Sequence, residues 1–286
     1  MTTVRELLAE GVERFERAGL AYGHGTTNPL DEAAWLILHA AGLPLADLEP
    51  NLDRTLTATQ LKAVRALLAR RIRTRKPAAY LTREAWLGRH RFYVDERAIV
   101  PRSFIFELLE PENGKMVSDT ISSVLDLCTG SGCLAILAAL AFPRAKVDAA
   151  DLSEDALAVA RKNVADYKLG RRIRLARSDL FSALAGRTYD LVLSNPPYVK
   201  AASMRRLPEE YRKEPPMALA SGADGLDHTR AILAGAREHL KPGGLLVVEI
   251  GHNRRALEKA FPHLPFQWPR TSGGSGFVFM LSREML

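Results

Sequence analysis

Long hydrophobic runs are missing from this 286-residue sequence, and cysteines are rare. No apolar stretch reaches the roughly 18 residues that a membrane-spanning helix needs, so we expect no contact with a membrane. The first 20 residues carry charges throughout and lack the apolar core of a signal peptide, which predicts a cytoplasmic protein. Cys128 and Cys133 have neither the spacing of metal ligands nor that of a disulfide framework, so we predict no metal site.

Acidic residues are absent between positions 54 and 79, where eight Lys and Arg side chains gather. The whole chain has a formal net charge of +7. The sequence leaves two interpretations of this basic helix open. It is either a solvated helix face whose cations lie near the helix C-terminus, or a surface that contacts RNA.

Two kinds of hydrophobic periodicity divide the chain. Apolar residues recur at helical spacing in residues 1–84, which predicts a small helical domain. Residues 85–110 contain short apolar runs around a glycine, which predicts a β-hairpin linker. From position 123 strands and helices alternate, so residues 111–286 are predicted to form an α/β domain that begins in the polar loop 111–119.

The α/β domain is predicted to contain a doubly wound, mostly parallel sheet, because right-handed strand–helix–strand connections produce that arrangement. Seven runs are predicted as its strands: SVLDLC, KVDAAD, RIRLARSD, YDLVLSN, LLVVEI, PFQWPR and GFVFMLS. In such a sheet, ligands bind at the carboxyl ends of the strands.

A glycine-containing turn follows the first of these strands. Within VLDLCTGSGC (124–133), glycines let the backbone approach a ligand closely. A dinucleotide site would have G-x-G-x-x-G here, but Cys128 occupies the first glycine position and no third glycine follows. The turn therefore favours a smaller ligand with a carboxylate and a ribose over a pyrophosphate. The candidate ligand-binding residues are Asp126, Cys128, Thr129, Gly130, Ser131 and Gly132.

The next two strands end in carboxylates. Asp151 ends the second strand, 19 residues after Gly132, and can accept hydrogen bonds from both hydroxyls of a ribose. Asp179, at the end of the third strand, can accept from the exocyclic amine of adenine, and Leu180 can contact its flat ring. With the turn, these residues predict an adenosine site without a pyrophosphate, which fits S-adenosylmethionine (AdoMet).

The fourth strand runs into Asn195, Pro196, Pro197 and Tyr198. Prolines cannot donate to a β-ladder, so the strand must stop at Asn195. The Asn195 side-chain oxygen and the Pro196 carbonyl form a fixed pair of acceptors for a planar NH₂ group, and Tyr198 offers an aromatic face. Alignment of such a nitrogen with an activated methyl group can supply much of the catalysis, so no catalytic base is predicted.

These motifs together resemble those of the protein glutamine N(5)-methyltransferases, the family with the HemK/PrmC and PrmB branches. The resemblance covers nearly the whole chain and is carried by DLCTGSGC (126–133), NPPY (195–198) and EPPMALASGADGLDHTRAIL (214–233). AYLTREAWLGRHRFYVDERAIVPRS (79–103) is similar to the PrmB branch, which methylates the third protein of the large ribosomal subunit. NPPY alone is also shared with adenine and cytosine amino-methyltransferases.

The resemblance implies a class I, Rossmann-like methyltransferase that uses AdoMet. By position, residues 128–132 would hold the methionine part of AdoMet and Asp151 its ribose. Asp179 and Leu180 would lie at the adenine, and residues 195–198 would hold the glutamine amide. The N-terminal helical domain would recognise the substrate.

The resemblance also implies partners. The expected substrate is the third large-subunit protein, either free or within an assembling ribosomal subunit, and an RNA contact of the basic 54–76 helix would then involve ribosomal RNA. Arg102 lies in the stretch that lines the family's active site, where it either contacts the substrate or joins the domains. Competing hypotheses are a release-factor glutamine methyltransferase, an adenine N6 amino-methyltransferase and a non-catalytic module that binds AdoMet.

Overall fold

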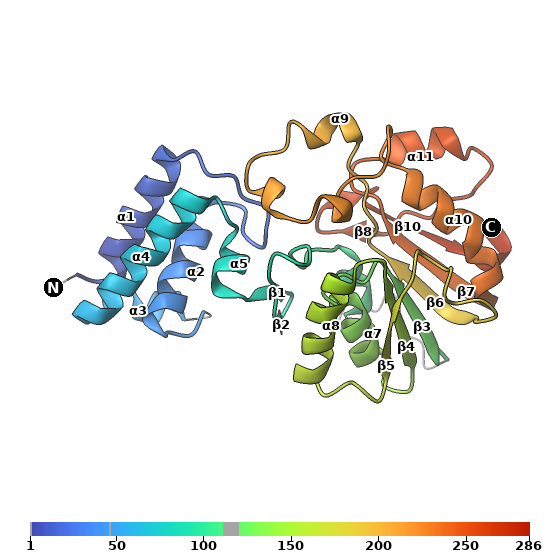
Figure 1. Cartoon of the computed structure of the whole chain (residues 1–286), viewed down its shortest axis with the longest axis horizontal. Coiled ribbons are helices and arrows are strands. Elements are labelled where there is room, and N and C mark those ends of the chain that lie inside the picture. Colours follow the sequence, from blue (N-terminus) through green and yellow to red (C-terminus); the bar gives the residue numbers. More distant parts are fainter. Residues whose placement is uncertain (1, 46, 111–119) are drawn as a thin grey trace.

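A computed structural model describes residues 2–45, 47–110 and 120–286. It contains a helical lobe, blue and cyan in Figure 1, and a larger lobe built around a β-sheet. The C-terminus lies on the side of the sheet lobe that faces away from the helical lobe (Figure 1). The polar loop predicted for residues 111–119 lies outside the described residues.

Three long and two short helices form the helical lobe, and they are α1 (Val4–Arg17), α2 (Pro29–Ala41), α3 (Leu48–Asn51), α4 (Ala58–Thr74) and α5 (Ala78–Thr82). α1 and α4 each begin at a capping box, formed by Thr3 with Glu6 and by Thr57 with Gln60. The apolar faces of these helices enclose one core. Its fully buried side chains include Leu7, Phe15, Leu36, Ile37 and Leu68.

A short antiparallel hairpin, β1 (Ala85–Leu87) and β2 (His90–Phe92), joins the two lobes, as the sequence predicts. Leu87 and Phe92 of the hairpin pack into the core of the sheet lobe. Val100, a few residues later, packs into the core of the helical lobe. Because the connecting residues are buried in both cores, they hold the two lobes against each other.

The main sheet has six strands in the order β10–β7–β6–β3–β4–β5. Five strands run parallel, and β10 pairs with β7 in the antiparallel direction, which confirms the predicted, mostly parallel arrangement. The strands are β3 (Ser123–Leu127), β4 (Lys146–Asp151), β5 (Ile173–Arg177), β6 (Tyr189–Ser194), β7 (Leu240–Glu249) and β10 (Val278–Ser282).

The predicted number of seven strands is wrong, because the run at residues 265–270 does not form a strand of this sheet. It contributes a single bridge between Gln267 and Met280. Pro265 and Pro269 lack the N–H groups that a longer ladder would need. A separate two-stranded hairpin follows, made of β8 (Arg270–Thr271) and β9 (Gly274–Ser275).

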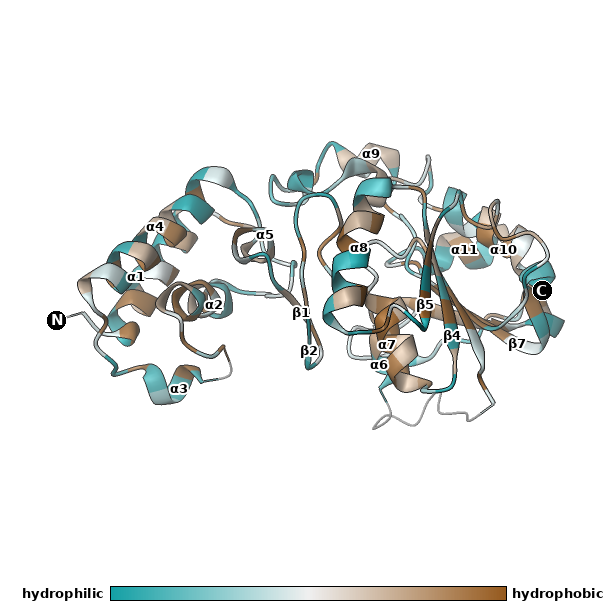
Figure 2. Cartoon of the chain, turned by 60° about the horizontal axis from the view of Figure 1, so that its bottom comes forward, coloured by the Kyte–Doolittle hydropathy of each residue, from teal (hydrophilic) through white to brown (hydrophobic). Residues whose placement is uncertain are grey.

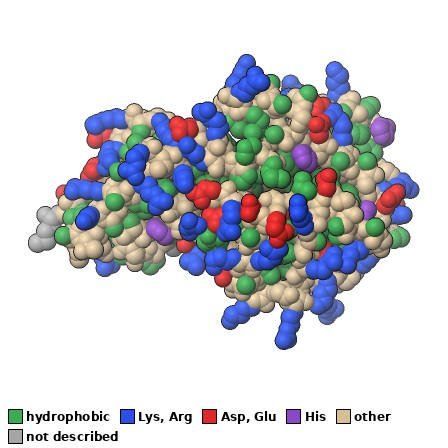
Figure 3. Space-filling model, in the orientation of Figure 1, with side chains coloured by type: hydrophobic (Ala, Val, Ile, Leu, Met, Phe, Trp, Pro, Cys, Tyr) green, Lys and Arg blue, Asp and Glu red, His purple; other side chains and the backbone are tan. Residues whose placement is uncertain are grey.

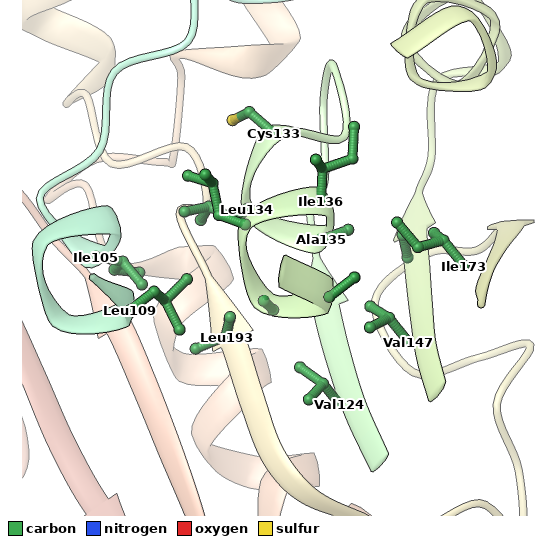
Figure 4. Packing of buried hydrophobic residues seen from close by; sticks show 14 of the residues in the cluster. Ile105, Leu109, Val124, Cys133, Leu134, Ala135, Ile136, Val147, Ile173 and Leu193 are labelled. Atoms are coloured by element: carbon green, nitrogen blue, oxygen red, sulfur yellow. The ribbon is translucent and has the colours of Figure 1, made fainter. Parts of the chain in front are cut away.

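Helices cover both faces of the sheet, and the hydrophobic residues lie toward the interior (Figure 2). One face packs against α6 (Ile105–Leu109), α7 (Cys133–Ala141) and α8 (Glu154–Asp166). The other face packs against α10 (Asp227–His239) and α11 (Arg254–Ala260). Figure 4 shows the first interface, where side chains of α7 meet those of the strands, among them Leu134, Ile136, Val124, Val147 and Leu193. In the described part of the chain, no helix has the length and apolarity to cross a membrane.

The strand order reverses between β3 and β6. The chain passes from β3 to β4 and β5 on one side, and β6 and β7 lie on the other. The ends of β3 and β6 are tied together, because the Ser194 hydroxyl donates to the Leu127 carbonyl at 2.9 Å. In doubly wound sheets a ligand binds outside the carboxyl ends of the strands at such a reversal. The fold therefore predicts a ligand site between the turn after β3 and the loop after β6.

Candidate active site

A cavity of about 700 Å³, partly open to solvent, lies at the carboxyl ends of β3, β4, β5 and β6. Seven of the residues selected from the sequence line it together: Cys128, Gly130, Asp151, Asp179, Leu180, Asn195 and Pro197. They come from four strand ends that are far apart in the sequence, and the parallel sheet brings them to one edge.

The other members of the glycine turn do not line this cavity. Asp126 is fully buried, and its carboxylate accepts from the Thr129 hydroxyl and from an N–H at the start of α7. Burial raises the pKa of Asp126 to about 7. Gly132 packs against α8, where an added Cβ would lie 3.1 Å from the Ala160 Cβ. Asp126, Ser131 and Gly132 therefore help to shape the turn, and none of them lines the cavity.

Cys128 occupies a backbone position suited to glycine. Its φ of +57° lies in the left-handed region that side chains other than glycine rarely adopt. Burial raises the pKa of its thiol, so the thiol stays protonated and is not a nucleophile. Cys128 thus contributes backbone shape at the cavity rather than sulfur chemistry.

Two carboxylates, those of Asp151 and Asp179, line the first cavity. Asp151 accepts from the Gly130 N–H at 2.8 Å and from the Ser153 N–H at 2.9 Å, and burial raises its pKa. Each of its oxygens keeps a second lone pair for a ligand. Asp179 lies at the end of β5 and lines the same cavity. Two carboxylates attract a cation, so the cavity suits the positively charged sulfonium of AdoMet.

Asn195 lies between this cavity and a second one of about 690 Å³. Its Nδ2 donates to the Arg102 carbonyl at 3.1 Å. Because only the NH₂ end of the amide can make that bond, Oδ1 is left to accept from a ligand. Pro196 and Tyr198 line the second cavity, so the predicted amide receptor opens on the side away from the carboxylates.

Arg102 joins the segments around the second cavity. Its guanidinium donates to both oxygens of the buried Glu214 carboxylate, each at 2.6 Å. Glu214 also accepts from the Val100 N–H at 3.0 Å. Burial alone would raise the pKa of Glu214, but the charge and hydrogen bonds of Arg102 lower it to about 2. Arg102 thus ties the linker to the segment before α10, and it also lines the second cavity, so joining and substrate contact both stay predictions for its role.

The helical lobe reaches the second cavity through Gly23. Gly23 has a φ of +123°, and an added Cβ would lie 2.1 Å from the Tyr211 Oη. The Tyr211 hydroxyl donates to the Tyr22 carbonyl at 3.2 Å. Tyr211 and Leu207, which follow α9 (Ala201–Met204), line the cavity beside Gly23. Both lobes therefore form this cavity, and only a glycine at position 23 leaves room for the tyrosine.

The sequence by itself assigns no role to Glu214, Tyr211 or His228, which lie at the two cavities. His228 lines the first cavity, and its Nδ1 is 2.9 Å from the Ser221 Oγ. Because Glu214 and His228 belong to the 214–233 motif, this motif could have pointed to them as site residues. Tyr211 lies in SNPPYVKAASMRRLPEEYRKEP (194–215), a stretch that is also similar to the PrmB branch, but only the packing of distant segments shows that it reaches the site.

The basic stretch at residues 54–76 is only partly available to a partner. Arg71 is fully buried and donates to Glu32 at 2.6 Å and to Glu210 at 3.3 Å. Arg75 donates to Glu210 at 3.1 Å. These two cations stabilise the contact between the helical lobe and the segment after β6, so the stretch is not a simple RNA-facing surface.

The doubly wound sheet, with its glycine turn, two carboxylates and an amide at the strand ends, defines an AdoMet-dependent methyltransferase of the Rossmann-like class. Comparison with protein-family models agrees. The model of the methyltransferase small domain matches residues 113–210, and the model of the PrmC N-terminal domain matches residues 6–82.

Similarity to individual proteins extends over the whole chain. The ribosomal protein uL3 glutamine methyltransferase of Neisseria meningitidis serogroup B is 56% identical over 288 residues, which cover 100% of this chain and 95% of that protein. The protein of the same name from Burkholderia pseudomallei is 54% identical over 293 residues, covering 99% and 95%. The chain belongs to the family of ribosomal protein uL3 glutamine methyltransferases, which confirms the predicted family.

A solved structure confirms the fold class. The catalytic domain of hMettl16, in complex with hairpin 1 of the MAT2A 3′UTR, matches with a TM-score of 0.53 and 13% sequence identity. The match covers 82% of this chain and 84% of that chain. At this identity the likeness concerns the fold alone.

Proposed function

We propose that this protein transfers the methyl group of AdoMet to the side-chain amide nitrogen of a glutamine in ribosomal protein uL3. The observation that carries the proposal is the position of Asn195 between the two cavities, with Oδ1 left to accept because Nδ2 is bound to the Arg102 carbonyl. The family supports the choice of substrate, because its members carry the name of uL3 glutamine methyltransferases.

The first cavity provides the contacts that AdoMet needs. In this proposal Asp151 accepts from the ribose hydroxyls, Asp179 accepts from the adenine amine, and Leu180 packs against the base. Of the turn at residues 128–132, Cys128 and Gly130 line the cavity, and their backbone holds the methionine part. Each hydrogen bond to a carboxylate contributes roughly 1.5–3 kcal/mol. When bound, AdoMet supplies a methyl group activated by its positively charged sulfur.

Asn195 and Pro196 orient the acceptor amide in the second cavity. Their oxygens accept from the two hydrogens of the glutamine NH₂ group, which aligns the nitrogen with the first cavity. The same oxygens stabilise the positive charge that grows on this nitrogen during transfer. Tyr198 offers an aromatic face to the planar amide. Correct alignment can contribute about 7–11 kcal/mol, and the excess proton leaves to water without a catalytic base.

The division of the chain follows from these roles. We assign residues 1–84 to substrate recognition, residues 85–110 to the linker and residues 111–286 to methyl transfer. The contact of Gly23 with Tyr211 at the second cavity supports the first assignment. A ribosomal protein as substrate implies a cytoplasmic reaction, on free uL3 or within an assembling subunit.

The test offers the purified protein and methyl-labelled AdoMet to uL3, to a peptide release factor and to adenine-containing DNA in separate reactions. We expect label on uL3, and mass spectrometry of its peptides should place one added methyl group on a glutamine. A release factor and an adenine base present a similar planar NH₂ group, so label on either of them alone would contradict the proposal. Binding of AdoMet without transfer to any of the three would favour a non-catalytic module.

A further inference from the structure

Four basic side chains follow β6 and have no acidic partner among the residues that the structure describes. Lys200, Arg205, Arg206 and Arg212 are exposed, and none of them forms an ion pair or a side-chain hydrogen bond there. We call these four side chains the basic rim. The glutamates of the same segment are already neutralised, in the pairs Glu209–Lys213, Glu210–Arg71, Glu210–Arg75 and Glu214–Arg102. The exposed charge of this segment is therefore positive.

The basic rim lies beside the second cavity. Three of its members are direct chain neighbours of residues that line the cavity, in the pairs Val199–Lys200, Arg206–Leu207 and Tyr211–Arg212. Figure 3 shows Lys and Arg side chains projecting at the upper edge of the molecule, above a group of hydrophobic side chains, where Figure 1 places α9 and the segment after it. The unpaired charge thus lies where the acceptor amide would enter.

We propose that the basic rim binds the phosphate backbone of RNA next to the methylated glutamine, so that the enzyme recognises its substrate protein on RNA. The proposal rests on the proposed function, which makes a ribosomal protein the substrate. Three of the four rim residues are arginines, and a guanidinium without a carboxylate partner pairs with phosphate through two parallel hydrogen bonds. Several unpaired cations beside a cavity attract a polyanion more strongly than a neutral peptide.

The rim also changes where an RNA contact is expected. The sequence suggests the 54–76 helix for this role, but Arg71 and Arg75 of that helix are bound to Glu210. Glu210 belongs to the same segment as the rim. Arg71 and Arg75 therefore hold in place the segment that carries the basic rim.

The first test measures RNA binding directly, by fluorescence anisotropy of a labelled oligouridylate at a series of salt concentrations. Arg205→Glu combined with Arg206→Glu is expected to weaken binding about tenfold or more and to reduce the slope of log affinity against log salt by about 0.7 for each lost phosphate contact. Arg144→Glu combined with Arg171→Glu is the matched control. Both control residues are exposed and precede β4 and β5, at the opposite end of the sheet. Equal binding by the two variants would overturn the proposal.

The second test compares methyl transfer to free uL3 with transfer to uL3 bound to a ribosomal RNA fragment. The variant at Arg205 and Arg206 should lose about tenfold in kcat/KM on the RNA-bound protein and keep the wild-type value on free uL3. An equal loss of kcat/KM on both substrates would mean that the basic rim binds an acidic part of the protein uL3 itself. That result would overturn the proposal. RNA binding is measured without uL3, so a wild-type enzyme that fails to methylate uL3 would refute only the proposed function.

Discussion

At the scale of single residues, the proposed chemistry depends on the orientation of Asn195. A side-chain amide presents an acceptor at one end and a donor at the other, and only the acceptor can receive the NH₂ group of a substrate glutamine. The Arg102 carbonyl engages the donor end at 3.1 Å. The residue type follows from the sequence motif, but its useful orientation depends on a backbone carbonyl 93 residues away.

Asn195→Ala is expected to lower kcat for glutamine methylation by about 10²–10³-fold, because it removes one fixed acceptor for the charge that develops on nitrogen. AdoMet affinity, measured by isothermal titration calorimetry, should change little, since the carboxylates of the first cavity remain. Wild-type turnover in this variant would exclude Asn195 as the amide receptor. A loss of AdoMet binding equal to the loss of turnover would assign the residue to the cofactor instead.

At the scale of elements, the segment between β6 and α10 does more than connect a strand to a helix. It begins with Asn195 and contributes Leu207 and Tyr211 to the second cavity. Glu210 attaches it to the helical lobe through Arg71, and Glu214 attaches it to the linker through Arg102. A segment with so little regular structure is ordered by these ion pairs, so its position depends on residues of the other lobe.

Gly23→Ala tests that dependence, because the added Cβ would overlap the Tyr211 hydroxyl. We expect kcat/KM for uL3 to fall by about 10- to 100-fold through misplacement of the cavity wall, with AdoMet affinity retained. Gly25→Ala is the matched control, since Gly25 has a similarly large positive φ, +103°, but an added Cβ there would make only ordinary contacts, the nearest at 3.4 Å from Trp35. If both variants lost the same activity, backbone strain rather than the contact with Tyr211 would be responsible.

At the scale of the whole molecule, buried ion pairs unite the two lobes. Arg71 is fully buried in the helical lobe and reaches Glu210 of the sheet lobe. The linker adds a second connection, because Arg102 pairs with Glu214. Removing one member of such a pair leaves an uncompensated buried charge, so these contacts should govern the stability of the entire fold.

Arg71→Met is expected to lower the free energy of unfolding by about 3–5 kcal/mol, because Glu32 and Glu210 would lose their guanidinium partner. Arg70→Met, at the exposed neighbouring position of α4, should change it by no more than about 0.5 kcal/mol. Urea denaturation of both variants measures the difference. Similar values for the two would show that the buried network is not needed for stability.

The pH dependence of stability should have two limbs. The pKa of Glu214 is about 2 in the folded state, below its ordinary value of 4.5, so its contribution is present above pH 4.5 and is lost as the pH falls toward 2. Burial raises the pKa of Asp126 and Glu249 to about 7, above their ordinary values of 3.8 and 4.5. In the folded state these two groups hold protons that the unfolded chain has released, so stability is also lost as the pH rises from about 4 to 7.

Urea denaturation across this pH range should therefore show maximum stability in the weakly acidic region, between the two limbs. Glu249→Gln should flatten the decline toward neutral pH, because an amide cannot lose the proton and still accepts from the Ser103 hydroxyl through its oxygen. An unchanged slope between pH 5 and 7 in this variant would show that Glu249 does not titrate in that interval.

The sequence by itself determined the order of strands and helices, the parallel sheet, the family and the strand ends at which a ligand would bind. These features depend on local periodicity and on short motifs, such as the two prolines that stop β6 after Ser194. Only the tertiary structure decided that Asp126 faces inward while Gly130 lines the cavity, that Arg102 binds Glu214, and that residues 265–270 form no strand of the sheet. The physical reason is that the direction of a side chain and the partner of a charge depend on which distant segments pack against them. Arg102 and Glu214 lie 112 residues apart, and no local pattern encodes that contact.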